Sequence, residues 1–163
     1  MLIQILANTP LWVYGLFIFL LVFGFVQTRT RLVNKVPALL LPVGMIVLSL
    51  SGVHSSFGLE LLPLAAWGCA LIIVTVAGYV LFKDERIHFK ASEGKYFIPG
   101  SWAPFMVMMA IFFAKYLYAV MSSLGAEIIT TPIFIGTLAA VYGILSGYFA
   151  SRAVNLISQA QKA

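Results

Sequence analysis

One lysine lies deep inside an apolar stretch of this 163-residue sequence. Lys115 comes eleven residues after Pro104, which is about 16 Å along a helix. If a helix begins at that proline, the ammonium group lies near the middle of a bilayer. A lysine at that depth costs about 2.5–3.5 kcal/mol on insertion scales, and no carboxylate lies in any apolar run to compensate it.

The leading interpretation is that Lys115 binds an anion or another substrate group. It would then face a water-filled interior pocket, together with nearby phenol hydroxyls that can also donate hydrogen bonds. The candidate hydroxyls belong to Tyr116, Tyr118 and Tyr142.

Two other interpretations of Lys115 stay open. As a structural cation it would bond backbone carbonyls or reach outward to Glu60 or Glu127. As a snorkelling residue it would reach an interface, which needs a helix that begins earlier, near Tyr96. The same two glutamates are also candidate carboxylates at an outer mouth, although a glutamate in a first helical turn is typical of simple dipole compensation.

The sequence predicts neither an enzyme nor a metal or cofactor site. Cys69 is the single cysteine, and His54 and His88 are expected on opposite sides of the membrane. HExxH, a Gly-rich phosphate loop and a Ser/His/Asp set are all missing from the sequence. We therefore expect no catalytic residues, no metal ligands and no cofactor.

The composition predicts an integral membrane protein. Hydrophobic residues make up 62% and charged residues 9% of the chain, and the mean hydropathy is +1.04. Soluble domains carry about 25% charged residues. The net charge of +5 comes from lysines and arginines that flank the apolar runs, as orientation signals do, so no nucleic-acid partner is expected.

Five apolar runs are long enough for transmembrane helices. The predicted fold is all-α, with helices at about 10–27, 37–56, 62–82, 104–123 and 132–151. The basic residues place the N-terminus outside and the C-terminus in the cytoplasm, in a cell (inner) membrane.

We expect one membrane domain, residues 1–163, whose parts follow from the helices. Its parts are an added first helix and basic inner loop (1–36), a first hairpin (37–83), a cytoplasmic loop (84–103), a second hairpin (104–152) and a cytoplasmic tail (153–163). Aromatic residues around Pro99–Gly100 are typical of a plain re-entry turn with an aromatic belt, and the alternative is that residues 96–104 lie on the cytoplasmic headgroups.

The two hairpins resemble each other. Ser55-Ser56-Phe57-Gly58-Leu59-Glu60 has a counterpart in Ser122-Ser123-Leu124-Gly125-Ala126-Glu127, and prolines and Gly-Tyr pairs also align. This predicts a parallel tandem repeat. The alternative is convergence, because Ser-Ser-x-Gly is also a common way to end a helix with a left-handed glycine.

Gly143 and Gly147 give the last helix a face of small residues, which permits close helix packing. The partner of that face is either another helix of this chain or a second copy. The lipid bilayer is the other expected partner, together with a possible homo-oligomer or membrane protein partner.

The layout resembles small multi-pass bacterial inner-membrane proteins of an uncharacterised family. The resemblance rests on Arg29-Thr30-Arg31 after the first helix and on Pro99-Gly100-Ser101-Trp102 before the fourth. It implies no activity. The leading functional hypothesis is a carrier or channel-like protein that uses Lys115 to bind a small solute, for which an anion is the candidate. The alternative is a non-catalytic accessory or assembly subunit of a membrane complex.

Overall fold

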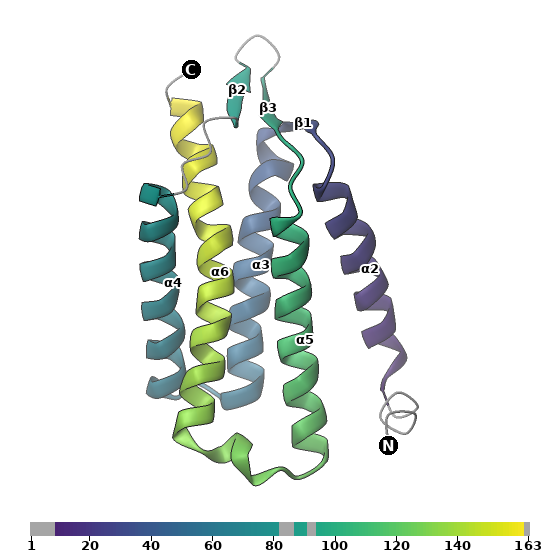
Figure 1. Ribbon diagram of the computed structural model, residues 1–163, viewed down its shortest axis with the longest axis vertical. Coiled ribbons are helices and arrows are strands. Elements are labelled where there is room, and N and C mark those ends of the chain that lie inside the picture. Colours follow the sequence, from purple (N-terminus) through teal and green to yellow (C-terminus); the bar gives the residue numbers. More distant parts are fainter. Residues whose placement is uncertain (1–8, 82–86, 91–93, 162–163) are drawn as a thin grey trace.

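The computed structural model describes residues 9–81, 87–90 and 94–161. Within them the chain forms a bundle of five α-helices with a small sheet at one end (Figure 1). The helices are α2 (Leu11–Gln27), α3 (Lys35–Phe57), α4 (Leu61–Leu81), α5 (Ala103–Ser123) and α6 (Pro132–Gln161), with a 3-10 turn, η1 (Glu127–Thr130). The prediction of five helices is confirmed in number.

Four of these helices, α3 to α6, are long and apolar enough to cross a membrane. The remaining helix, α2, is apolar as well but has only 17 residues. The observed bounds lie within about two residues of the predicted ones, with one exception at the C-terminus. There α6 continues without a break to Gln161, so the predicted end of the fifth helix at about residue 151 is wrong.

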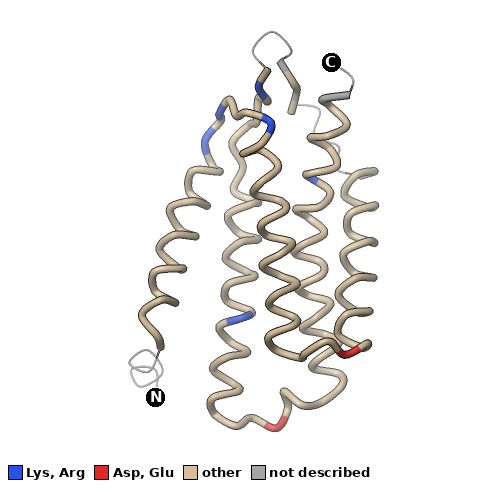
Figure 2. Tube along the Cα trace, turned by 180° about the vertical axis from the view of Figure 1, so that it is seen from behind, with Lys and Arg blue, Asp and Glu red and all other residues tan. Residues whose placement is uncertain are grey.

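The charged residues divide between the two ends of the bundle (Figure 2). We call the end that holds the strands the sheet end, and the end that holds η1 and the α3–α4 connection the turn end. Glu60 and Glu127 lie at the turn end, and the described lysines and arginines lie at the sheet end, except Lys115 within α5. The predicted inner residues 82–86 and 91–93 lie outside the described residues.

The sheet was not predicted from the sequence. Strands β1 (Arg31–Asn34), β2 (His88–Lys90) and β3 (Lys95–Ile98) form an antiparallel sheet in the order β1-β3-β2. Alternate residues of β3 face the bundle, so Tyr96 and Ile98 are buried against Leu156 of α6 and Ala38 of α3. The alternative that this segment lies on the headgroups is therefore wrong for these two side chains.

The largest contact between helices joins α4 and α6. A Cβ added at Gly143 would collide with the carbonyl of Trp67, and one at Gly147 would lie 2.7 Å from the Cβ of Val74. The missing side chains let the two backbones approach closely. The small-residue face of α6 is thus filled by α4 of the same chain.

Both Ser-Ser-x-Gly sequences end a helix, as predicted. Gly58 follows α3 with φ of +72°, and Gly125 follows α5 with φ of +66°. The two hairpins nevertheless have different surroundings, because α6 packs against α3 and α4 whereas α5 packs chiefly against α2.

Candidate binding site around Lys115

A cavity of about 830 Å³ lies between α2, α3 and α5, with one side chain contributed by α6. Its volume is in the range of small-molecule sites. The helices that form it pack loosely, since α2 makes its main contact with α5 and the cavity separates it from α3. The lining residues are Thr9, Pro10, Trp12, Val13, Leu16, Leu20, Met45, Leu48, Gly52, Met108, Ile111, Phe112, Lys115, Tyr116, Ala119, Val120, Ser123, Leu124 and Tyr142.

Lys115 lines this cavity from α5. It lies eight residues before the end of the helix at Ser123, about 12 Å along the axis. Within the described part of the chain, no hydrogen bond or ion pair involves its ammonium group. A lysine inside an apolar bundle is ordinarily paired with an acid or with carbonyl groups. The described structure gives Lys115 no such partner, and it therefore offers the charge to whatever enters the cavity.

Tyr142 brings a second donor to the same cavity. Its side chain is fully buried, and its hydroxyl has no hydrogen-bond partner in the described structure. Gly52 of α3 lies beside it, because a Cβ there would be in ordinary van der Waals contact, 3.9 Å from the tyrosine ring and 4.0 Å from Cδ of Lys115. The glycine, the lysine and the tyrosine thus meet at one place. A buried hydroxyl without a partner costs free energy, which a bound acceptor would recover.

The Tyr142 backbone is held in place by bonds between helices. Its carbonyl accepts a hydrogen bond from Ser49 Oγ at 3.1 Å, and Trp67 Nε1 donates to the same serine oxygen at 3.1 Å. Ser49 is itself fully buried. These bonds connect α4, α3 and α6, so the wall that carries Tyr142 belongs to the packed side of the bundle.

A smaller pocket, of about 370 Å³, adjoins the cavity toward the turn end. The two spaces share Lys115, Ala119 and Ser123. Hydroxyl groups of Ser55, Ser56 and Ser122 line the smaller pocket. Lys115 therefore stands between an apolar space and a more polar one that leads toward the turn end.

The predicted tyrosines all lie around Lys115, but they differ in availability. Tyr116 lines the main cavity, and its hydroxyl lies 3.1 Å from Thr9 Oγ1. Tyr118 lines the smaller pocket and donates to the Ser56 carbonyl at 2.6 Å. Only Tyr142 combines complete burial with an unpartnered hydroxyl.

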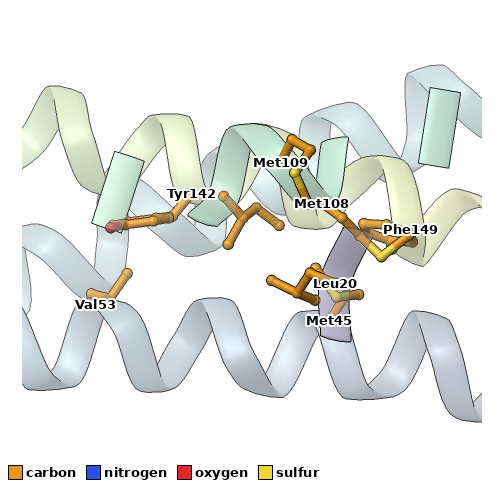
Figure 3. Packing of buried hydrophobic residues seen from close by; sticks show 8 residues of the cluster. Leu20, Met45, Val53, Met108, Met109, Tyr142 and Phe149 are labelled. Carbon is orange, nitrogen blue, oxygen red and sulfur yellow. The ribbon is translucent and has the colours of Figure 1, made fainter. Parts of the chain in front are cut away.

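The cavity is closed toward the sheet end by buried apolar side chains. Leu20, Met45 and Met108 belong to the main hydrophobic core and also line the cavity. Figure 3 shows them gathered with Phe149, while Tyr142 lies further along beside Val53. The cavity is therefore a blind pocket and not a pore through the bundle.

The predicted outer carboxylates do not take part. Glu60 and Glu127 are exposed, and neither lines the cavity or the smaller pocket. No described ion pair joins either of them to Lys115. The structural interpretation in which Lys115 reaches toward these two glutamates therefore finds no support in the described residues.

A second group of buried polar residues lies at the sheet end, and the sequence did not reveal it. Arg31 donates from Nη2 to Gln27 Oε1, and Gln27 is 3% exposed. Burial, and then the nearby guanidinium of Arg152, lower the pKa of Arg31. Neither Arg31 nor Arg152 lines the cavity or the smaller pocket. Gln27 Nε2 and Arg31 Nε are buried without a described hydrogen-bond partner, so this junction between α2, the sheet and α6 holds two like charges close together.

The sequence also missed the role of the first helix. It is predicted to be an addition to a four-helix core, whereas α2 and the two residues before it supply one wall of the cavity, from Thr9 to Leu20. Trp12 and Tyr14, near the start of that helix, are the aromatic residues typical of an interface. Nothing in its apolar pattern distinguishes a cavity wall from a lipid-facing helix.

A family model described as a family of unknown function (DUF6622) matches residues 1–163, so the chain belongs to that family. No curated protein and no solved structure matches the chain. The expectation of an uncharacterised family is confirmed.

Proposed function

We propose that this member of the DUF6622 family is a multi-pass membrane protein that binds a small anionic solute at Lys115 and carries it across the membrane. One observation carries the proposal. An ammonium group without a described partner and the buried, unpartnered hydroxyl of Tyr142 face the same cavity. Polar groups inside a membrane protein that face a cavity are typical of substrate pathways.

The proposal includes an orientation. We infer that all five helices cross the membrane, with the sheet end in the cytoplasm and the turn end outside. The support is the distribution of lysine and arginine, which favour the cytoplasmic side. In this orientation the cavity begins near the outer surface, at Thr9 and Leu124, and extends inward past Lys115 as far as Met108.

A carrier fits this geometry better than a channel does. The core at Leu20, Met45 and Met108 closes the cavity toward the sheet end. Carriers expose a central site to one side of the membrane at a time. The loosely packed α2 is the element whose movement would alter that closure, because one of the three closing residues, Leu20, belongs to it.

The test is uptake of labelled octanesulfonate into vesicles that contain the purified protein. A sulfonate stays ionised, so it does not cross the bilayer as a neutral acid. We expect Lys115→Met to abolish protein-dependent uptake, and Lys95→Met, at the sheet end and outside the cavity, to leave it unchanged. Uptake that is equal in wild type and Lys115→Met would overturn the proposal.

A further inference from the structure

The cavity offers very few polar groups to a ligand. Ser123 Oγ already donates to the Val120 carbonyl at 2.8 Å, and the hydroxyls of Thr9 and Tyr116 contact each other. Among the described lining residues, the Lys115 ammonium and the Tyr142 hydroxyl are the two donors that lie together beside Gly52 without a described partner, and the indole N–H of Trp12 belongs to a residue that is 67% exposed. Two donors can satisfy one small acceptor group and no more.

The rest of the lining is apolar. It comes from α2, α3 and α5, with Leu16, Met45, Met108 and Ile111 among its members. A small hydrated anion would lose its water there without gaining enough hydrogen bonds. A ligand that fills this space must therefore carry an apolar body, with its polar group at one end only.

The single positive charge of Lys115 determines how many negative charges the polar group of the ligand should carry. A single ammonium balances a single negative charge, and one hydroxyl completes the coordination of a carboxylate. A phosphate monoester carries about two charges near neutral pH, which would leave one charge unbalanced in an apolar space. The cavity is thus suited to a monoanion.

We propose that the ligand is a single-chain amphiphile with a monoanionic head, of the fatty-carboxylate class. Its head binds Lys115 and Tyr142, and its chain extends along the cavity toward Met108. This inference rests on the proposed function and specifies its ligand. Such a molecule enters from the bilayer, because Trp12 of α2 and Leu48 of α3 line the cavity and are also exposed, at 67% and 38%.

In a membrane, the apolar chain of the ligand contributes to binding differently than it would in water. Its transfer from lipid into an apolar cavity gains little, because both surroundings are apolar. The chain raises occupancy by concentrating the ligand in the bilayer, and it does so more strongly with each added methylene. The selectivity for this ligand over other lipids comes from the head group at Lys115 and Tyr142.

The experiment is native mass spectrometry of the protein released from nanodiscs after incubation with dodecanoate, butyrate or dodecanol. The wild type should carry one dodecanoate. Dodecanol, which has the same chain without the charge, and butyrate should each show at least about tenfold lower occupancy. The Lys115→Met variant should lose about tenfold or more for dodecanoate, and Tyr142→Phe a few-fold. The Lys95→Met control should behave as wild type.

A cavity-filling variant tests whether the apolar chain of the ligand is needed, separately from the anionic head group on which the proposed function depends. Leu16→Trp places bulk in the apolar part of the cavity without removing either donor, and should reduce dodecanoate binding. Equal occupancy of dodecanol and dodecanoate would overturn the inference. So would Lys115-dependent binding of butyrate that matches dodecanoate, although the proposed anion site would then stand. If Lys115→Met alters neither dodecanoate binding nor octanesulfonate uptake, both proposals fail.

Discussion

The two sides of the bundle differ in how closely their helices pack. On the α4–α6 side, Gly143 and Gly147 bring backbones together, and the buried hydroxyl of Ser49 is bonded on both sides. On the α2–α5 side, the helices stand around a cavity that holds Lys115. The packed side is where the chain gains its stability, and the open side is where polar groups are left for a ligand. Stability and binding are thus separated in space.

The largest loss of stability is expected when a side chain is added where the backbones of α4 and α6 approach most closely. In Gly143→Ala the new Cβ collides with the Trp67 carbonyl, which belongs to the backbone and cannot rotate away. We expect a loss of about 3 kcal/mol or more, which is a fall in Tm of roughly 6–12 °C. Thermal unfolding in mild detergent measures it. Gly136→Ala on the same helix meets no atom within 4 Å and should change Tm little; equal shifts for both would contradict this account.

The hydroxyl bonded between three helices gives the next effect. Ser49→Ala removes a donor to the Tyr142 carbonyl and leaves the Trp67 indole N–H without its acceptor. The expected loss is about 1–3 kcal/mol, since a buried donor is left unsatisfied. Ser123→Ala, which removes a local bond at an exposed position, is the matched control. A larger effect in the control would argue against the proposed importance of the α3–α4–α6 contact.

On the α2–α5 side, a substitution beside the cavity should weaken ligand binding without lowering stability. Gly52→Ala adds a Cβ at 3.9–4.0 Å from Tyr142 and Lys115, an ordinary contact distance. Alanine is favoured over glycine inside a helix by up to about 1 kcal/mol. We therefore expect equal or higher Tm together with weaker dodecanoate binding. Destabilisation by this substitution would show that the cavity is tightly packed in solution.

The smallest effect concerns pH at the sheet end. Burial raises the pKa of Tyr96 above its ordinary value of 10.0, so the folded protein holds this proton where the unfolded chain releases it. The stabilisation is complete below about pH 10 and is lost as pH rises toward the folded pKa. In chemical denaturation above pH 10, the free energy of unfolding should fall less steeply in Tyr96→Phe than in wild type. Identical slopes would contradict the burial of this phenol.

Part of this structure could be predicted from the sequence. Apolar runs opened by Pro104 and Pro132 predicted the starts of α5 and α6 to within one residue, since hydropathy and proline placement act locally. The sheet could not be predicted in this way. Its strands have only three or four residues, and β1 pairs with β3, whose residues are more than sixty positions away in the sequence.

The site was predicted in its residue types but not in its form. Lys115 stood out because a lone cation in an apolar run is costly, and Tyr116, Tyr118 and Tyr142 were candidates by proximity or by chemistry. The sequence could not show that, of these three tyrosines, Tyr142 has the buried, unpartnered hydroxyl. Nor could it show that Gly52 lies beside Tyr142 and Lys115. Both facts depend on how helices pack across the bundle.

The most direct measurement compares the thermal unfolding of purified wild type and Lys115→Met in mild detergent, without added ligand. If Lys115 serves a ligand and not the fold, the variant is as stable as wild type or more stable, because a costly buried cation has been replaced by an apolar chain of similar length. A Tm several degrees lower in Lys115→Met would show that native partners hold the lysine, and would contradict the account.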